Sequence, residues 1–154
     1  MTYYYLGWCL VQGKLSGAEQ AFADAANACP DYCFPNRLEA ILALQCAMEQ
    51  NPNDAKAPYY LGNLYYDKRQ YDLALEAWET SAGLDDKFAT IWRNLALANF
   101  NKKDEEATAI EYMERAFQLD TTDARVLMEL DQLYKRVRRP HSERLGVLAA
   151  IPPN

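Results

Sequence analysis

The chain has 154 residues, 50% of them hydrophobic, which suffices for one globular unit with a substantial core. Its formal net charge of -6 gives no general attraction to phosphate backbones or anionic membranes, so nucleic acid is not an expected partner. No apolar run approaches the roughly 18 residues of a membrane span, and no basic segment precedes the apolar stretch at 3–11 as in a secretory signal. We therefore expect a cytoplasmic protein.

The first predicted element is a helical hairpin over residues 3–30. It opens with YYLGWCL at residues 4–10, and Ala18, Phe22 and Ala25 follow at helical spacing. A Pro-containing loop then leads to one single predicted helix over residues 36–50, which ends at Asn-Pro-Asn. This helix has the pattern of a second helix whose first helix is missing.

A second hairpin is predicted over residues 55–86. It opens with YYLGNLYY at residues 59–66, a near copy of the earlier stretch. The second helix of this hairpin carries Tyr71, Leu75 and Trp78 at i, i+4 and i+7, and the three residues between the helices allow only a tight antiparallel turn. Gly62 is expected where helices approach closely, with Trp78 filling space in the core.

The same spacing predicts a hairpin over residues 89–121 and a C-terminal helix pair over 123–151. Leu61-Gly62 is followed after 34 residues by Leu95-Ala96, and after a further 35 residues by Leu130-Asp131. The hairpin over 89–121 has one extra residue in its turn, at 101–106. A recurrence of this length is typical of repeated helical hairpins.

These residues resemble the tetratricopeptide repeat (TPR) family, whose unit carries W-x2-L-G-x2-Y, then A-x3-F, A and P. The unit over 59–85 matches at Leu61, Gly62, Tyr65, Ala74 and Trp78, with Asp86 at the usual proline. The unit over 89–121 departs at Asn99, where an aromatic is usual. The resemblance implies an all-α, right-handed superhelical solenoid of antiparallel hairpins, with seven or eight helices in a single domain over 1–154.

Members of this family generally bind peptides or proteins along the concave surface that the first helices line. The resemblance therefore implies a protein–protein interaction module without catalysis. The face opposite the stacking residues supplies the candidate binding residues, which are Tyr59, Asn63, Tyr66, Arg93, Asn94, Phe100, Arg125 and Gln132. Asparagine can donate and accept, as an extended backbone requires, and arginine can fork onto a carboxylate.

Some family members hold a chaperone's C-terminal carboxylate in a clamp of Lys, Asn, Asn, Lys and Arg. This chain matches the clamp only at Asn63 and Asn94, and Arg125 replaces a lysine. Tyr59 and Glu129 break the pattern, and a negative Glu129 would repel a carboxylate. That specific activity is therefore not expected.

Two alternatives to groove binding stay open at this stage. The chain can be a structural spacer or self-association element in a longer chain, in which case the aromatic N-terminal helix would form a homodimer. The central units also resemble the repeat tails of large bacterial multidomain proteins, which implies that the chain is a fragment of one.

Neither a catalytic site nor a metal or cofactor site is indicated. His141 has no motif around it, and four cysteines stand at Cys9, Cys29, Cys33 and Cys46, with a C-x3-C spacing in the one close pair. They are expected as small hydrophobes in a reducing compartment, and a redox pair of Cys29 and Cys33 is the minor alternative. The basic run KRVRR at 135–139 is expected to be a solvated helix end, with an acidic partner as its alternative.

Overall fold

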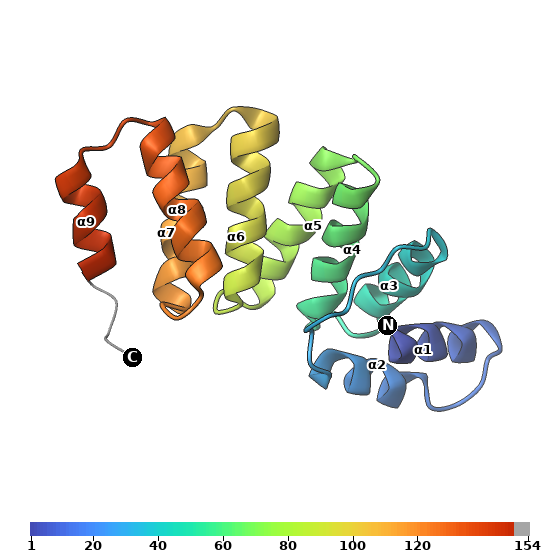
Figure 1. The fold of residues 1–154 in the computed structure, drawn as a ribbon. Helices are drawn as coiled ribbons and strands as arrows, with labels where there is room; N and C mark the ends of the chain where they lie inside the picture. The colour runs from blue at the N-terminus through green and yellow to red at the C-terminus, as the bar shows by residue number, and fades with distance from the viewer. Residues whose placement is uncertain (150–154) are drawn as a thin grey trace. The chain divides into compact units, whose positions relative to one another are not determined.

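The computed structural model describes residues 1–149, whose regular structure is entirely helical (Figure 1). The elements are α1 (Thr2–Gln12), α2 (Ala18–Asn27), α3 (Glu39–Gln50), α4 (Lys56–Asp67), α5 (Tyr71–Leu84), α6 (Ala89–Ala98), the π-helical turn η1 (Asn99–Lys103), α7 (Glu106–Leu119), α8 (Ala124–Arg136) and α9 (His141–Ala149). The predicted all-α class is confirmed. This part of the chain has nine α-helices, against the seven or eight that the resemblance implies. The elements predicted one by one, namely three hairpins, a single helix and a C-terminal pair, also add up to nine.

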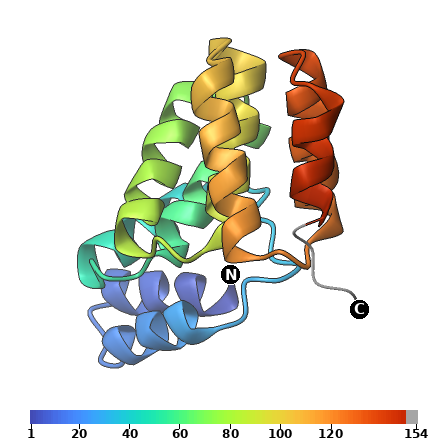
Figure 2. The ribbon, with the colours of Figure 1, turned by 90° about the vertical axis from the view of Figure 1, so that its left-hand side faces the viewer.

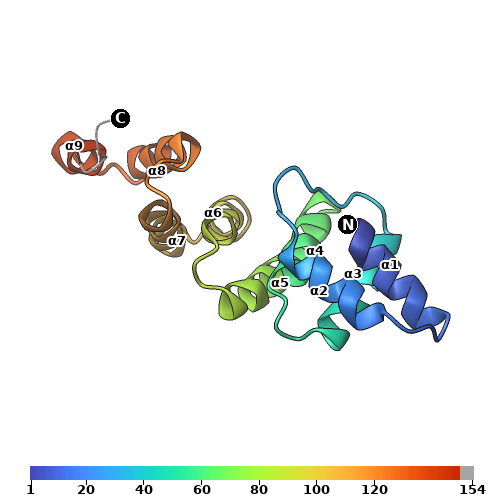
Figure 3. The same ribbon diagram turned by 90° about the horizontal axis from the view of Figure 1, so that it is seen from below.

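The chain divides into two compact units. Unit 1 spans Met1–Asp86 and contains two antiparallel hairpins, α1–α2 and α4–α5, with α3 packed against α1 and α4 (Figure 1). Unit 2 begins at Lys87 and contains the hairpin α6–α7, with α8 packed against α7 and α9 beside α8 (Figure 2). Seen end on, the helices of unit 2 have nearly parallel axes, whichever way the chain runs along each (Figure 3). A single domain over 1–154 stays a prediction, and residues 150 and 151 of the predicted C-terminal pair lie outside the described residues.

The predicted single helix over 36–50 begins three residues late, at Glu39. The chain has no regular structure from Cys33 to Asn36 and turns at Arg37 and Leu38, whose carbonyls accept from the amides of Ala40 and Ile41. Leu38 already has helical backbone angles, but the start of α3 has no side-chain cap and the helix does not extend further towards residue 36.

Three hairpin turns end their first helix in the same way. Lys14, Arg69 and Arg138 each have a positive φ, and in each turn the next amide donates to a carbonyl five residues earlier. This is the Schellman arrangement, which satisfies carbonyls at a helix end. The turn geometry is therefore repeated along with the helices. In all three turns, the residue with left-handed backbone angles is not glycine.

Gly7 and Gly62 explain the two copies of aromatic-aromatic-Leu-Gly. A Cβ atom on Gly62 would lie 2.4 Å from Cδ1 of Trp78, and one on Gly7 would lie 2.6 Å from Cε1 of Phe22. In both hairpins, the glycine on the first helix lies against an aromatic ring on the second helix. No other residue lets the ring approach the first helix this closely.

A buried polar pair ties the start of unit 1 to its middle. The hydroxyl of Tyr4, whose side chain is 1% exposed, donates to Oδ2 of Asp54 at 2.8 Å, and Asp54 is 3% exposed. Oδ1 of Asp54 accepts from the amide of Lys56 at the start of α4. Burial, together with the Asp54 charge, raises the pKa of Tyr4 well above its usual range, so the phenol stays a donor.

The core of unit 2 is a continuous apolar cluster contributed by α6, α7 and α8. Its buried members are Ala96, Ile110, Met113, Ala116, Phe117, Val126, Leu130, Leu133 and Tyr134. The hydroxyl of Tyr134 donates to Glu114 at 2.7 Å, and burial raises the pKa of Tyr134. This cluster fixes how α6 and α8 present their remaining faces.

Candidate protein-binding faces

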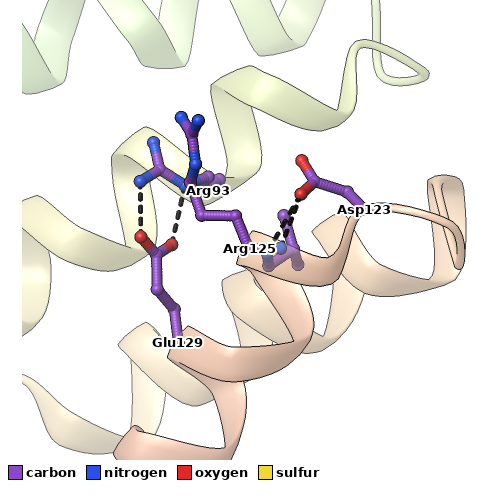
Figure 4. Close-up of polar contacts among 5 residues, drawn as sticks. Arg93, Asp123, Arg125 and Glu129 are labelled. Carbon is purple, nitrogen blue, oxygen red and sulfur yellow. Dashed lines mark hydrogen bonds and ion pairs between the residues drawn. The ribbon is translucent and has the colours of Figure 1, made fainter.

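In unit 2, the first helices α6 and α8 are joined by a two-pronged ion pair. Nε of Arg93 donates to Oε2 of Glu129 at 2.7 Å, and Nη2 donates to Oε1 at 2.5 Å (Figure 4). The two side chains are only 19% and 16% exposed. The guanidinium that was expected to fork onto a ligand carboxylate therefore already forks onto Glu129.

The beginning of α8 is fixed by Asp123. Oδ1 of this N-cap residue accepts from the amides of Arg125 and Val126, at 2.8 and 3.3 Å (Figure 4). A side-chain cap of this kind satisfies amides that have no partner within the helix. The cap thus holds the backbone of Arg125, whose side chain is exposed.

The other end of the same face is built on the π-helical turn. The extra residue predicted in the turn at 101–106 is accommodated slightly earlier, as η1, and the amide of Glu105 donates to the carbonyl of Asn99. The buried side chain of Asn99 also donates, through Nδ2, to the carbonyl of Leu95 at 2.8 Å. In this turn, the ring of Phe100 lies under the guanidinium of Arg136, 5.5 Å away.

These two links place α6 and α8 in a common register. Arg93 with Glu129 and Phe100 with Arg136 are both pairs of residues 36 positions apart in sequence. Because the offset is equal, the helices run in the same direction and their faces align. Along α8 this side presents exposed Arg125, Gln132 and Arg136, and Met128 with 55% of its surface exposed. We call these four residues the α8 face.

The predicted basic run is tied into unit 2 at several positions. Lys135 pairs with Asp131 at 2.7 Å, and Arg139 pairs with Glu114 at 3.2 Å and lies over the ring of Tyr134. Arg144 of α9 binds the other oxygen of Asp131 at 2.8 Å. Hydrogen bonds from Arg144 and Lys135 lower the pKa of Asp131 to about 2.

In unit 1, the predicted binding residues Tyr59, Asn63 and Tyr66 surround Trp78. The indole N–H donates to Oδ1 of Asn63 at 3.1 Å and to the carbonyl of Tyr59 at 3.3 Å, and the ring of Tyr66 lies 5.4 Å from the indole. Tyr59 is only 6% exposed, so its expected place on an open face is wrong. Its ring packs against Tyr60 instead, 5.2 Å away.

No family model matches the chain. Among solved structures, it is similar to MamA from Desulfovibrio magneticus RS-1, with 22% identity, a TM-score of 0.60 and coverage of 87% of this chain and 70% of that one. It is also similar to the Yersinia enterocolitica type III secretion translocator chaperone SycD, with 19% identity, a TM-score of 0.60 and coverage of 89% and 84%. A third similar structure is the first TPR of Spaghetti (RPAP3) bound to an HSP90 peptide, with 16% identity, a TM-score of 0.58 and coverage of 65% and 81%.

The chain has a TPR fold. The predicted resemblance is therefore confirmed at the level of the fold, and the two Leu-Gly motifs mark first helices of TPR hairpins. Of the eight predicted binding residues, five lie in unit 2: Arg93, Asn94, Phe100, Arg125 and Gln132. The other three, in unit 1, surround Trp78.

Sequence reasoning missed Glu129 as the partner of Arg93, although the sequence contains a signal for this pair. In a TPR array, residues about one repeat apart lie on neighbouring first helices. The spacing of 35 from Leu95 to Leu130, which already includes the extra residue of the turn, places the equivalent of Arg93 one position before Glu129.

Neither a metal cluster nor a disulfide occurs among residues 1–149. No group of three His, Cys, Asp or Glu side chains is placed to hold a metal ion there, and Cys9, Cys29, Cys33 and Cys46 are free thiols. Cys29 and Cys33 are thus not joined by a disulfide in this structure. The described helices also include none that is long and apolar enough to cross a membrane.

Proposed function

We propose that this TPR chain is a non-catalytic protein–protein interaction module that binds a peptide or protein segment on its first helices. The observation that carries the proposal is the α8 face, where aligned first helices leave Met128 and three polar side chains exposed. Packing of the core does not require these side chains to be large or charged. The similar structures include a chaperone and a TPR bound to a peptide, which supports this class of function.

All eight predicted residues enter the proposal, with different roles. Arg125, Gln132 and the half-buried Phe100 and Asn94 would contact the segment, while Arg93 holds Glu129 in place. In unit 1, the half-buried Asn63 and Tyr66 would contact a segment at their exposed edges. Tyr59 would act indirectly, because its carbonyl holds the indole of Trp78.

We expect the paired substitution Arg125→Ala and Gln132→Ala to abolish capture of bound proteins from lysate. Alanine has the highest helix propensity, so α8 should remain intact. The matched control is Glu111→Ala with Gln118→Ala, which changes two exposed residues of the second helix α7. Circular dichroism checks that both variants fold. Retention of every captured protein by the first variant would contradict the proposal.

A cytoplasmic location and the absence of nucleic acid partners remain parts of this proposal. The supporting features are the four free thiols and the net charge of -6.

Self-association is a second candidate function, favoured by the surface of α1. Tyr3 and Leu6, one helical turn apart, are 45% and 48% exposed. If this face forms a homodimer, sedimentation velocity should show a mass that rises with protein concentration, and Tyr3→Gln with Leu6→Gln should abolish the rise. A constant monomer mass across concentrations would exclude it.

A further inference from the structure

Charge along α8 indicates what kind of segment this face takes. The chain as a whole is acidic, yet the exposed Arg125 and Arg136 stand at opposite ends of one helical face. We propose that the α8 face binds an acidic segment through Arg125 and Arg136, with an apolar side chain of that segment over Met128. This inference rests on the proposed function and names the chemistry of its ligand.

The acidic side chains of α8 do not oppose such a ligand, because each has a cation beside it. Glu129 is held by Arg93, and Asp131 is held by Lys135 and Arg144. Asp123, just before the helix, accepts from backbone amides. The positive charges of Arg125 and Arg136 are therefore not neutralised by the acidic residues of this helix.

The two guanidinium groups are available for a ligand. Within the described residues neither takes part in an ion pair, and the Arg136 guanidinium lies over the ring of Phe100. A cation–π contact does not use the N–H groups of the guanidinium as hydrogen-bond donors. The contact with Phe100 thus leaves the hydrogen-bond donors of Arg136 for a ligand.

Helix geometry gives the spacing of the acidic groups. Arg125 and Arg136 are separated by three helical turns, which places them on one side and about 16 Å apart along the axis. An extended peptide advances about 3.3 Å per residue and directs successive side chains to opposite sides. Two acidic side chains that face α8 together, with one residue midway on the same side, would therefore be four residues apart, about 13 Å, which the long arginine side chains can span. Met128, between the arginines, would meet an apolar residue between the acidic ones.

The test uses the whole chain and a synthetic probe. The probe is a fluorescein-labelled peptide, blocked at both ends, with two glutamates at this spacing and a leucine midway, and binding is followed by fluorescence anisotropy at low salt. The variant is Arg125→Gln with Arg136→Gln, which keeps helix propensity and removes both charges. The matched control, Lys14→Gln with Arg37→Gln, removes two exposed charges of unit 1.

We expect the intact chain and the control to bind equally, and the variant to bind about 100-fold more weakly, because each charge-assisted contact contributes about tenfold. A probe with adjacent glutamates should also bind more weakly than the spaced one. Equal binding of the spaced probe to the variant, or no binding to the intact chain, would overturn the inference.

A second experiment distinguishes failure of the acidic-segment inference from failure of the proposed function. In it, peptides that bind the intact chain are selected from a random displayed library. Enrichment of peptides with spaced acidic residues supports the inference. Neutral peptides that bind the intact chain but not Met128→Ser with Gln132→Ala would overturn the acidic ligand and retain the binding face. Enriched peptides that bind that variant equally well, or no enrichment at all, would overturn both.

Discussion

Replacing Gly62 with alanine should lower the free energy of unfolding of unit 1 by about 1–3 kcal/mol, the usual cost of overpacking a core. The added methyl would lie 2.4 Å from Cδ1 and 2.5 Å from Nε1 of Trp78. Trp78 cannot move away easily, because it is 3% exposed and its N–H is held by Asn63 and Tyr59. Urea unfolding followed by tryptophan fluorescence measures the loss.

Trp78→Ala should cost more, about 3–5 kcal/mol, since it leaves a cavity and removes the donor for Asn63. The two changes should not add, because alanine at position 62 no longer collides once the indole is gone. Gly83→Ala is the matched control: it lies in α5 with nothing within 4 Å of an added Cβ, and should be neutral or slightly stabilising. Equal effects of Gly62→Ala and Gly83→Ala would contradict the packing argument.

Local spacing predicts the hairpins well because each helix buries one periodic stripe. Phe22 and Trp78 were placed correctly in second helices, and the glycine opposite each ring follows from the close approach of two helices. The turn at 68–70 lies where the spacing predicts it, since only three residues separate the two stripes. At Gly7 and Gly62, the sequence motif therefore corresponds to a contact between a helix backbone and an aromatic ring.

Long-range polar contacts were not predictable in the same way. The pairing of Tyr4 with Asp54 joins residues 50 positions apart, and no periodicity relates them. Helical geometry alone places Tyr59 on an open face, but its ring is buried and packs against Tyr60. The exposure of a residue depends on all the helices that pack near it. The sequence indicates these neighbours only where the repeat predicts which helices are adjacent.

Glu129→Ala should lower the free energy of unfolding of unit 2 by about 1–3 kcal/mol, because it leaves the guanidinium of Arg93, 19% exposed, without its carboxylate. Adding Arg93→Ala should recover part of the loss, since the uncompensated charge is removed as well. Glu111→Ala, an exposed acidic residue on α7, is the control and should change stability little. Urea unfolding measures all three variants.

The same substitution connects stability with recognition. Without Glu129, Arg93 gains donors for a ligand between Arg125 and Arg136, so the spaced glutamate probe should bind more tightly to a protein that is less stable. A purely structural ion pair would lower stability and leave the affinity for the probe unchanged. Opposite changes in stability and affinity would mean that Glu129 limits how strongly this face attracts acidic segments, and that the chain gives up affinity to hold α6 and α8 in register.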